Sequence, residues 1–407
     1  MTAGHLPSTR DLRERIDTAE ILSRFHYQER AVVVGCAGWV PAVAKLETKA
    51  ALARAAWEGA LAGEALRERV FELRYPSRLL EAGSGTPIIR VYEGAADAPD
   101  ATAFLDGLGV LLRALSGDYR EFLAAADSLD DGPTIRILEA AARDHERQLG
   151  ELAGDPSSAW VEEVRRALEA LDPPRGQPFE LAEQPARDAR YFNSSVYWPD
   201  IVDPEYPYGE GLALQLRTAV SHLNEVWAVE TAGAILHELA EPLGWEFVHD
   251  AARWLYDESR HMLMGKRRLD AWGFDPADIP LGAYIYEACR GEDALTRLGM
   301  LGHFETKNIG RKRERAQAFR ALGDRTSETD MEFDWADETI HAEYGRRWMK
   351  RLLEQRGEDP DSWPEVLDRC DELVRRRVAQ VTPDERERIR RCADALVLKA
   401  EQIAARS

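Results

Sequence analysis

The sequence has few cysteines, no long apolar run and no excess of basic charge. Its four cysteines, Cys36, Cys289, Cys370 and Cys392, are scattered without a C-x-x-C pair. This pattern argues against a disulfide framework or a zinc ribbon and favours reduced thiols in a cytoplasmic protein. We also expect no membrane span, because no apolar stretch reaches 18 residues without a charge, and the N-terminus lacks a signal-peptide pattern.

The charge balance is acidic, with 53 lysines and arginines against 73 aspartates and glutamates and a formal net charge of −20 at pH 7. Binding to nucleic-acid phosphates requires a concentrated basic face, so we expect no nucleic-acid partner. Hydrophobic residues make up 44% and charged residues 31% of the chain, which is typical of a soluble globular protein.

Strand-like alternation is nearly absent, whereas apolar residues recur at three- and four-residue spacing along most of the chain. The sequence therefore predicts an all-α protein. Residues 156–210 are rich in proline and aromatic residues and are expected to form a linker, whose aromatic part either covers a cavity or packs as a connection. A helical domain at 1–155 precedes this linker. A four-helix bundle at 211–355 and a helical extension at 356–407 follow it.

Proline and glycine residues divide the bundle region into four expected helices, at about 211–241, 246–272, 292–322 and 327–355. The second and fourth carry related motifs, DESRH at 257–261 and DETIH at 337–341, although the chain has only nine histidines. Residues three apart share one face of a helix, so Glu258 can bind a metal ion together with His261, and Glu338 together with His341. Two such pairs that face each other can hold two ions.

The first and third helices each offer one more carboxylate in an apolar stretch, Glu230 and Glu305. A lone glutamate in such a stretch is costly unless a charged group meets it. The predicted metal ligands, which are also the predicted catalytic residues, are Glu230, Glu258, His261, Glu305, Glu338 and His341. Asp334 and His237 remain open as further ligands, although a satisfied polar group near the core explains each of them better.

This set of residues resembles the ferritin-like di-iron carboxylate superfamily over residues 211–355. The aspartate before each glutamate is similar to the oxygen-activating branch of that superfamily. The resemblance implies that Asp257 and Asp337, each one turn before a histidine, steady the imidazoles. The layout is also similar to two-domain bacterial ferritin-like proteins, in which a helical domain precedes the metal bundle. Here Glu29 and Glu58 repeat the interval between Glu230 and Glu258, but Leu61 stands where a histidine is needed. We expect this domain to be free of metal, either as a degenerate bundle or as an unrelated helical domain.

Carboxylates and imidazoles suit iron or manganese, so the expected cofactor is a pair of iron ions, with manganese–iron as the alternative. The expected function is an O₂-dependent oxidoreductase that oxidises a small organic substrate by hydroxylation, N-oxygenation, desaturation or oxidative cleavage. Its expected partners are O₂, the substrate and an electron donor, and its expected state is a monomer or homodimer. A ferroxidase or other iron-handling protein is the alternative.

Overall fold

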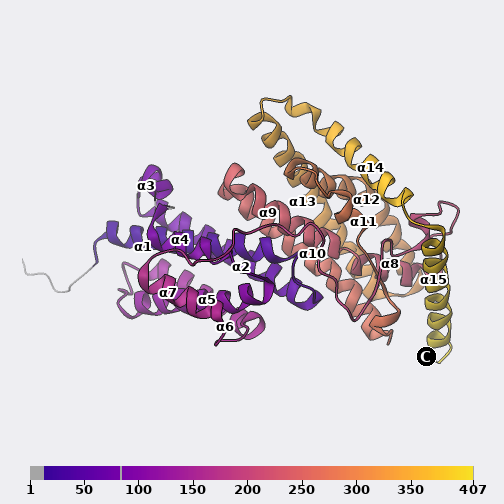
Figure 1. Ribbon diagram of the computed structural model, residues 1–407, viewed down its shortest axis with the longest axis horizontal. Coiled ribbons are helices and arrows are strands. Elements are labelled where there is room, and N and C mark those ends of the chain that lie inside the picture. The colour runs from indigo at the N-terminus through magenta and orange to yellow at the C-terminus, as the bar shows by residue number, and fades with distance from the viewer. Residues whose placement is uncertain (1–12, 83–84, 407) are drawn as a thin grey trace, which may run out of the picture. The chain divides into compact units, whose positions relative to one another are not determined.

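The computed structural model describes residues 13–82 and 85–406, and this part of the chain is almost entirely helical (Figure 1). The prediction of an all-α protein is confirmed. The chain divides into two compact units. The first contains Met1–Val33, Glu58–Pro99 and Ala103–Pro178, and the second contains Val34–Trp57, Asp100–Thr102 and Phe179–Ser407. This division differs from the predicted boundary at residue 155, because a helix inside the predicted linker belongs to the first unit and residues 34–57 belong to the second.

The first unit contains most of the N-terminal helices. They are α1 (Arg15–Trp39), α2 (Leu46–Glu72), α3 (Ser77–Ala82), α4 (Pro87–Gly94), α5 (Ala101–Ala124), α6 (Gly132–Leu152) and α7 (Ala159–Ala170), of which α1 and α2 each continue into the second unit. The buried carboxylate of Glu29 accepts a hydrogen bond of 2.6 Å from Tyr119 Oη and lies 3.0 Å from His145 Nε2. These side chains therefore satisfy one another inside the unit.

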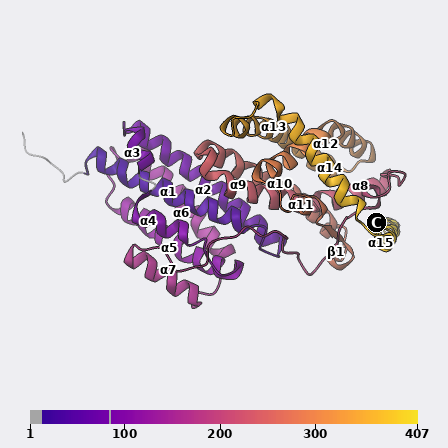
Figure 2. The same cartoon turned by 45° about the horizontal axis from the view of Figure 1, so that its top comes forward.

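The second unit is built on four long helices. They are α9 (Val226–Leu243), α10 (Trp245–Ala271), α12 (Ala294–Leu322) and α13 (Arg325–Gln355). In this bundle α9 packs on α10, α10 on α13, α13 on α12, and α12 on α9, so the four helices enclose one core (Figures 1 and 2). Shorter elements surround it: β1 (Phe192–Ser194), α8 (Gly211–Leu223), β2 (Pro280–Gly282), α11 (Tyr284–Ala288), α14 (Trp363–Ala379) and α15 (Pro383–Ala404).

The first predicted bundle helix is in fact two helices, α8 and α9, with a break at Asn224. The side chain of Asn224 donates to Val220 O at 2.8 Å and to Pro280 O at 2.9 Å, and it accepts from Gly282 N at 2.7 Å. It therefore ties the break to β2, which pairs in parallel with β1. This break changes which glutamate of the first helix faces the centre of the bundle.

Glycines allow the bundle helices to approach closely. A Cβ on Gly265 of α10 would lie 2.5 Å from Ala219 O and would also meet the backbone of Leu223, both on α8. Gly302 and Gly345 approach each other in the same way between α12 and α13. Of the two roles that a glycine such as Gly302 could have beside a metal site, close helix packing is the one that this geometry supports.

We expect the Gly265→Ala variant to lower the free energy of unfolding by about 3 kcal/mol, because the added methyl group meets backbone atoms that cannot rotate away. Gly310→Ala is the matched control. A Cβ at Gly310 of α12 meets nothing within 4 Å, so this change should stabilise the protein by about 0.5–1 kcal/mol through helix propensity. Urea denaturation of both variants tests the expectation, and equal effects would contradict the close approach of α8 and α10.

None of the helices in the described part of the chain combines the length and the apolar character that crossing a bilayer requires.

Candidate metal centre

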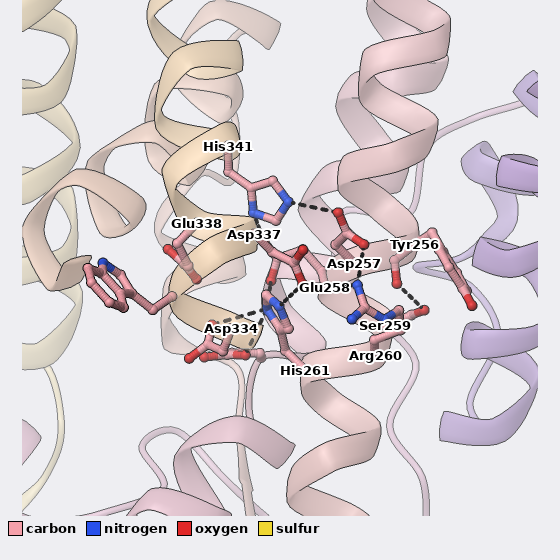
Figure 3. Close-up of polar contacts among 12 residues, drawn as sticks. Tyr256, Asp257, Glu258, Ser259, Arg260, His261, Asp334, Asp337, Glu338 and His341 are labelled. Atoms are coloured by element: carbon pink, nitrogen blue, oxygen red, sulfur yellow. Dashed lines mark hydrogen bonds and ion pairs between the residues drawn. The ribbon is translucent and has the colours of Figure 1, made fainter. Parts of the chain in front are cut away.

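Five of the six predicted ligands lie together inside the bundle. Glu258 and His261 project from α10, Glu338 and His341 from α13, and Glu305 from α12. All five side chains are at least nine-tenths buried. Figure 3 shows the α10 and α13 residues facing one another across the core. Among the described residues, the groups of three or more histidines and carboxylates close enough to share a metal ion all fall within residues 222–341.

The sixth predicted ligand, Glu230, lies elsewhere. Its Oε1 atom is 3.0 Å from Lys49 Nζ and 3.1 Å from Arg187 Nη1, and both Glu230 and Lys49 are fully buried. The expectation that a charged group must meet this buried glutamate is correct. The group is a lysine rather than a metal ion, so the assignment of Glu230 as a ligand is corrected here.

Glu225, at the break between α8 and α9, takes the place predicted for Glu230. It lies with Glu258 and His261 in one of the groups able to hold a metal ion. Glu225 precedes Glu258 by 33 residues, as Glu305 precedes Glu338, and every ligand of the first motif recurs 80 positions later. Equal spacing is therefore the sequence signal that identifies Glu225, whereas Glu230 precedes Glu258 by only 28 residues.

The centre has two halves that share Glu258. One oxygen of Glu258 lies 3.2 Å from His341 Nδ1, and the other lies 3.6 Å from His261 Nδ1. Glu305 completes the half around His341, and its Oε1 atom is 4.0 Å from Nδ1 of that ring. Glu225 completes the half around His261, with Oε2 at 3.5 Å from Nδ1. Glu338 approaches both halves, since it groups with each histidine.

Each histidine binds the aspartate of the other motif. His261 Nε2 lies 3.2 Å from Asp337 Oδ2, and His341 Nε2 lies 3.4 Å from Asp257 Oδ2. A carboxylate can only accept, so in both rings Nε2 carries the proton. The prediction that these aspartates contact the imidazoles is therefore correct, but the partner lies on the neighbouring helix rather than one turn away on the same helix.

Two arginines neutralise this pair of aspartates. Arg260 Nη1 lies 2.5 Å from Asp257 Oδ1 and 2.9 Å from Asp337 Oδ2, while Arg253 Nε donates to Asp257 at 2.6 Å. Both arginines are only partly buried, so they connect the buried aspartates to the surface. This arrangement keeps the aspartates ionised and fixes the orientation of both rings.

We expect Asp257→Asn and Asp337→Asn each to weaken metal binding by roughly 10–100-fold, because an amide no longer fixes the protonated nitrogen of the imidazole. Because of the crossed pairing, Asp337→Asn should affect the ion beside His261, and Asp257→Asn the ion beside His341. Titration with Mn(II), followed by electron paramagnetic resonance, measures each loss. Asp270→Asn is the control, since this exposed aspartate on α10 pairs with Lys266. Unchanged affinity in both aspartate variants would contradict the assigned role.

The half around His261 contains two further charged groups, Asp334 and Lys312. Asp334 is fully buried and groups with His261 and Glu338, which favours it as a further donor. Lys312 of α12 donates to Asp334 Oδ1 at 2.5 Å and to Glu338 Oε1 at 2.6 Å. His237, the other open candidate, packs against Phe179 with ring centroids 4.3 Å apart and is in none of the groups able to hold a metal ion.

His222 fixes the remaining oxygen of Asp334. Arg268 donates to His222 Nδ1, so the proton of this ring is on Nε2, which donates to Asp334 Oδ2 at 3.1 Å. Burial and the charge of Arg268 lower the pKa of His222 to about 3. His222 is therefore a neutral donor that orients Asp334. Sequence reasoning missed both His222 and Lys312, although Lys312 lies two helical turns after Glu305 on the same face.

The ionisable groups at the centre retain protons at neutral pH. Burial and the charge of Glu258 raise the pKa of Glu338 to about 8. Burial disfavours the imidazolium of His341, but the hydrogen bond with Asp257 and the contact with Glu258 raise its pKa to about 9. Crowded carboxylates in a buried site must share protons or bind cations.

The side chains at the centre fit a pair of divalent cations. The Nδ1 atoms of His261 and His341 and the Oε2 atom of Glu225 are buried and have no hydrogen-bond partner among the described residues. Buried polar atoms of this kind require an explanation, and a metal ion between them supplies one. The charges agree with this, because five carboxylates (Glu225, Glu258, Glu305, Asp334 and Glu338) and the Lys312 ammonium leave four negative charges beside two neutral imidazoles.

A cavity of about 360 Å³ opens onto this centre. Glu225, Glu258, Glu305 and Glu338 form its inner wall together with Lys312. Aromatic side chains form much of the rest, and they are Tyr197, Tyr208, Trp227, Tyr284 and Phe304. Two of these belong to the aromatic segment 191–208, which therefore contributes to the wall of a cavity as well as connecting helices.

Comparison with known proteins identifies a family but no described relative. No curated protein and no solved structure matches the chain. One family model matches residues 162–391, which are more than half of the chain and include every residue of the centre described above. The chain therefore belongs to the family described as "Protein of unknown function (DUF455)".

Proposed function

We propose that this protein is an O₂-dependent oxidoreductase whose bundle is a ferritin-like dinuclear metal centre. The observation that carries the proposal is the state of the two buried histidines. Each is fixed through Nε2 by an aspartate and turns an unpartnered Nδ1 atom toward Glu258. Imidazoles fixed in this way, surrounded by carboxylates, are typical of metal ligands. Iron is the expected metal, with manganese–iron as the alternative pair.

Two ferrous ions held by Glu225, Glu258, His261, Glu305, Glu338 and His341 would supply electrons to O₂. The protein contributes the arrangement around them. Asp257 and Asp337 hold the imidazole protons on Nε2 and leave Nδ1 free for the metal. Lys312 offsets the excess charge at Asp334 and Glu338. The aromatic walls of the cavity exclude water around a bound substrate, which favours its oxidation over side reactions.

The cavity favours an oxidase or oxygenase over the alternative of iron handling. An iron-handling site needs a path for hydrated cations. Here the walls are aromatic, and six basic side chains line the cavity: Arg217, Lys307, Arg311, Lys312, Arg315 and Arg375. Such a wall repels cations and is suited to an organic molecule.

The proposal predicts that the full-length protein, loaded anaerobically with Fe(II), binds about two ions per chain and consumes O₂ after exposure to air. Glu258→Ala removes the carboxylate shared by both halves and should lower O₂ consumption by at least about 100-fold, while circular dichroism shows unchanged helix content. Glu246→Ala on the same helix is the control, because Glu246 is exposed at the helix start. A metal content near zero, or one ion with no O₂ consumption, would contradict the proposal.

A further inference from the structure

One end of the cavity contains an arginine with an unused donor. Arg217 of α8 is buried, with 5% of its surface exposed, and it lines the cavity. Its Nε and Nη2 atoms donate to the two carboxylate oxygens of Asp200 at 3.1 and 3.0 Å. Its third nitrogen, Nη1, is buried and has no hydrogen-bond partner among the described residues. A buried guanidinium with a free donor is costly unless an acceptor binds there.

A second unused donor comes from Tyr208. Its ring lies against two guanidinium groups, with the Arg217 and Arg315 Cζ atoms each 4.8 Å from the ring centroid. Its hydroxyl group is buried and has no hydrogen-bond partner in the described part of the chain. Tyr208, Arg217 and Arg315 all line the same cavity. Two independent orphaned donors therefore accompany the same aromatic ring.

The charges around this ring leave a positive excess. Asp200 neutralises Arg217, but Arg315 and Arg311, one turn earlier on α12, form no ion pair with any described residue. The other cavity acid outside the metal centre, Asp371, is already paired with Lys307 at 2.8 Å and with Arg375. This part of the cavity is therefore cationic, although the chain has a net charge of −20.

We propose that the substrate is a small organic anion, whose carboxylate or phosphate group binds Arg217 Nη1 and the Tyr208 hydroxyl. Its apolar body then lies against Trp227, Phe304 and Tyr284 and extends toward Glu258 and Glu305. Arg315 adds a second positive charge at the anionic group. This inference rests on the proposed function for the statement that the bound anion is a substrate. Anion binding itself follows from the orphaned donors and the charge of the cavity.

The test measures binding and does not depend on turnover. The full-length protein, with and without added Mn(II), is titrated by calorimetry at constant ionic strength with phenylacetate, phenyl phosphate and the neutral isostere phenylacetamide. At least one anion should bind about 10-fold or more tightly than phenylacetamide, because hydrogen bonds to charged groups are the stronger ones. Preference for phenylacetate identifies a carboxylic acid, and preference for phenyl phosphate identifies a phosphate ester. Binding of neither anion above the neutral compound would overturn the inference.

Variants locate the bound anion. Tyr208→Phe removes a hydroxyl that has no partner in the free protein, so the fold is retained and the affinity for the anion should fall about 5-fold. Arg315→Gln should weaken binding by a similar factor. Arg313→Gln, an exposed arginine on the same helix, is the control. If Tyr208→Phe and Arg315→Gln bind the anion as tightly as the wild type, the anion binds elsewhere and the inference is wrong. Failure of Fe(II)-dependent O₂ consumption alone leaves the binding result intact and counts only against the proposed function.

Discussion

Replacing Glu225 with alanine should remove one of two bound metal ions and nearly abolish O₂ consumption. Glu225 supplies the carboxylate beside His261 that Glu305 supplies beside His341. Without it the half around His261 has lost the ligand that comes from the break between α8 and α9. The affinity for the second ion should fall by on the order of 100-fold or more, since even the loss of a residue that only orients a ligand costs 10–100-fold. Anaerobic titration with Fe(II) and measurement of metal content give the result.

The matched comparison is Glu230→Ala, five residues further along the same helix. This variant should retain two metal ions but lower the free energy of unfolding by about 3–5 kcal/mol, because Lys49 becomes a buried charge that has lost its carboxylate partner. Urea denaturation measures this loss. The opposite pattern, in which Glu230→Ala loses metal and Glu225→Ala retains it, would restore the ligand set predicted from sequence.

Metal affinity should rise steeply with pH. A metal ion must displace the protons that Glu338 holds up to a pKa of about 8 and that His341 holds up to a pKa of about 9. Below these pKa values each displaced proton contributes up to a tenfold change in affinity per pH unit. Between pH 6 and pH 8 the affinity for the ion beside His341 should therefore rise by on the order of 10³-fold or more, and it should level off above pH 9.

Calorimetry with Mn(II) in buffers of different ionisation enthalpy measures both the affinity and the number of protons released. Close to two protons should be released when the ion beside His341 binds at pH 7. The same two groups make the sign opposite for the stability of the metal-free protein. Their raised pKa values favour folding at low pH, and this contribution is lost as the pH rises through 8 and 9. Metal affinity that is independent of pH between 6 and 9 would contradict this account of the centre.

The sequence predicted the bundle and most of its centre for reasons that are local. Glycines and prolines mark the ends of α10, α12 and α13, and a spacing of three residues places each glutamate and histidine on one helix face. The repetition of Asp-Glu-x-x-His after 80 residues indicated two facing copies of one arrangement. These features depend on helix geometry, which a short stretch of chain determines by itself.

The tertiary structure decided which distant groups meet. Whether Glu225 or Glu230 faces the centre depends on the break at Asn224, which the backbone of β2 stabilises through three hydrogen bonds of the Asn224 side chain to groups far apart in sequence or across the break. The histidines bind the aspartates of the opposite helix because the helices pack closely enough for that contact. Lys49 reaches Glu230 from another part of the chain. Helix periodicity specifies directions around one axis, and only the packing of several axes determines which side chains share a charge.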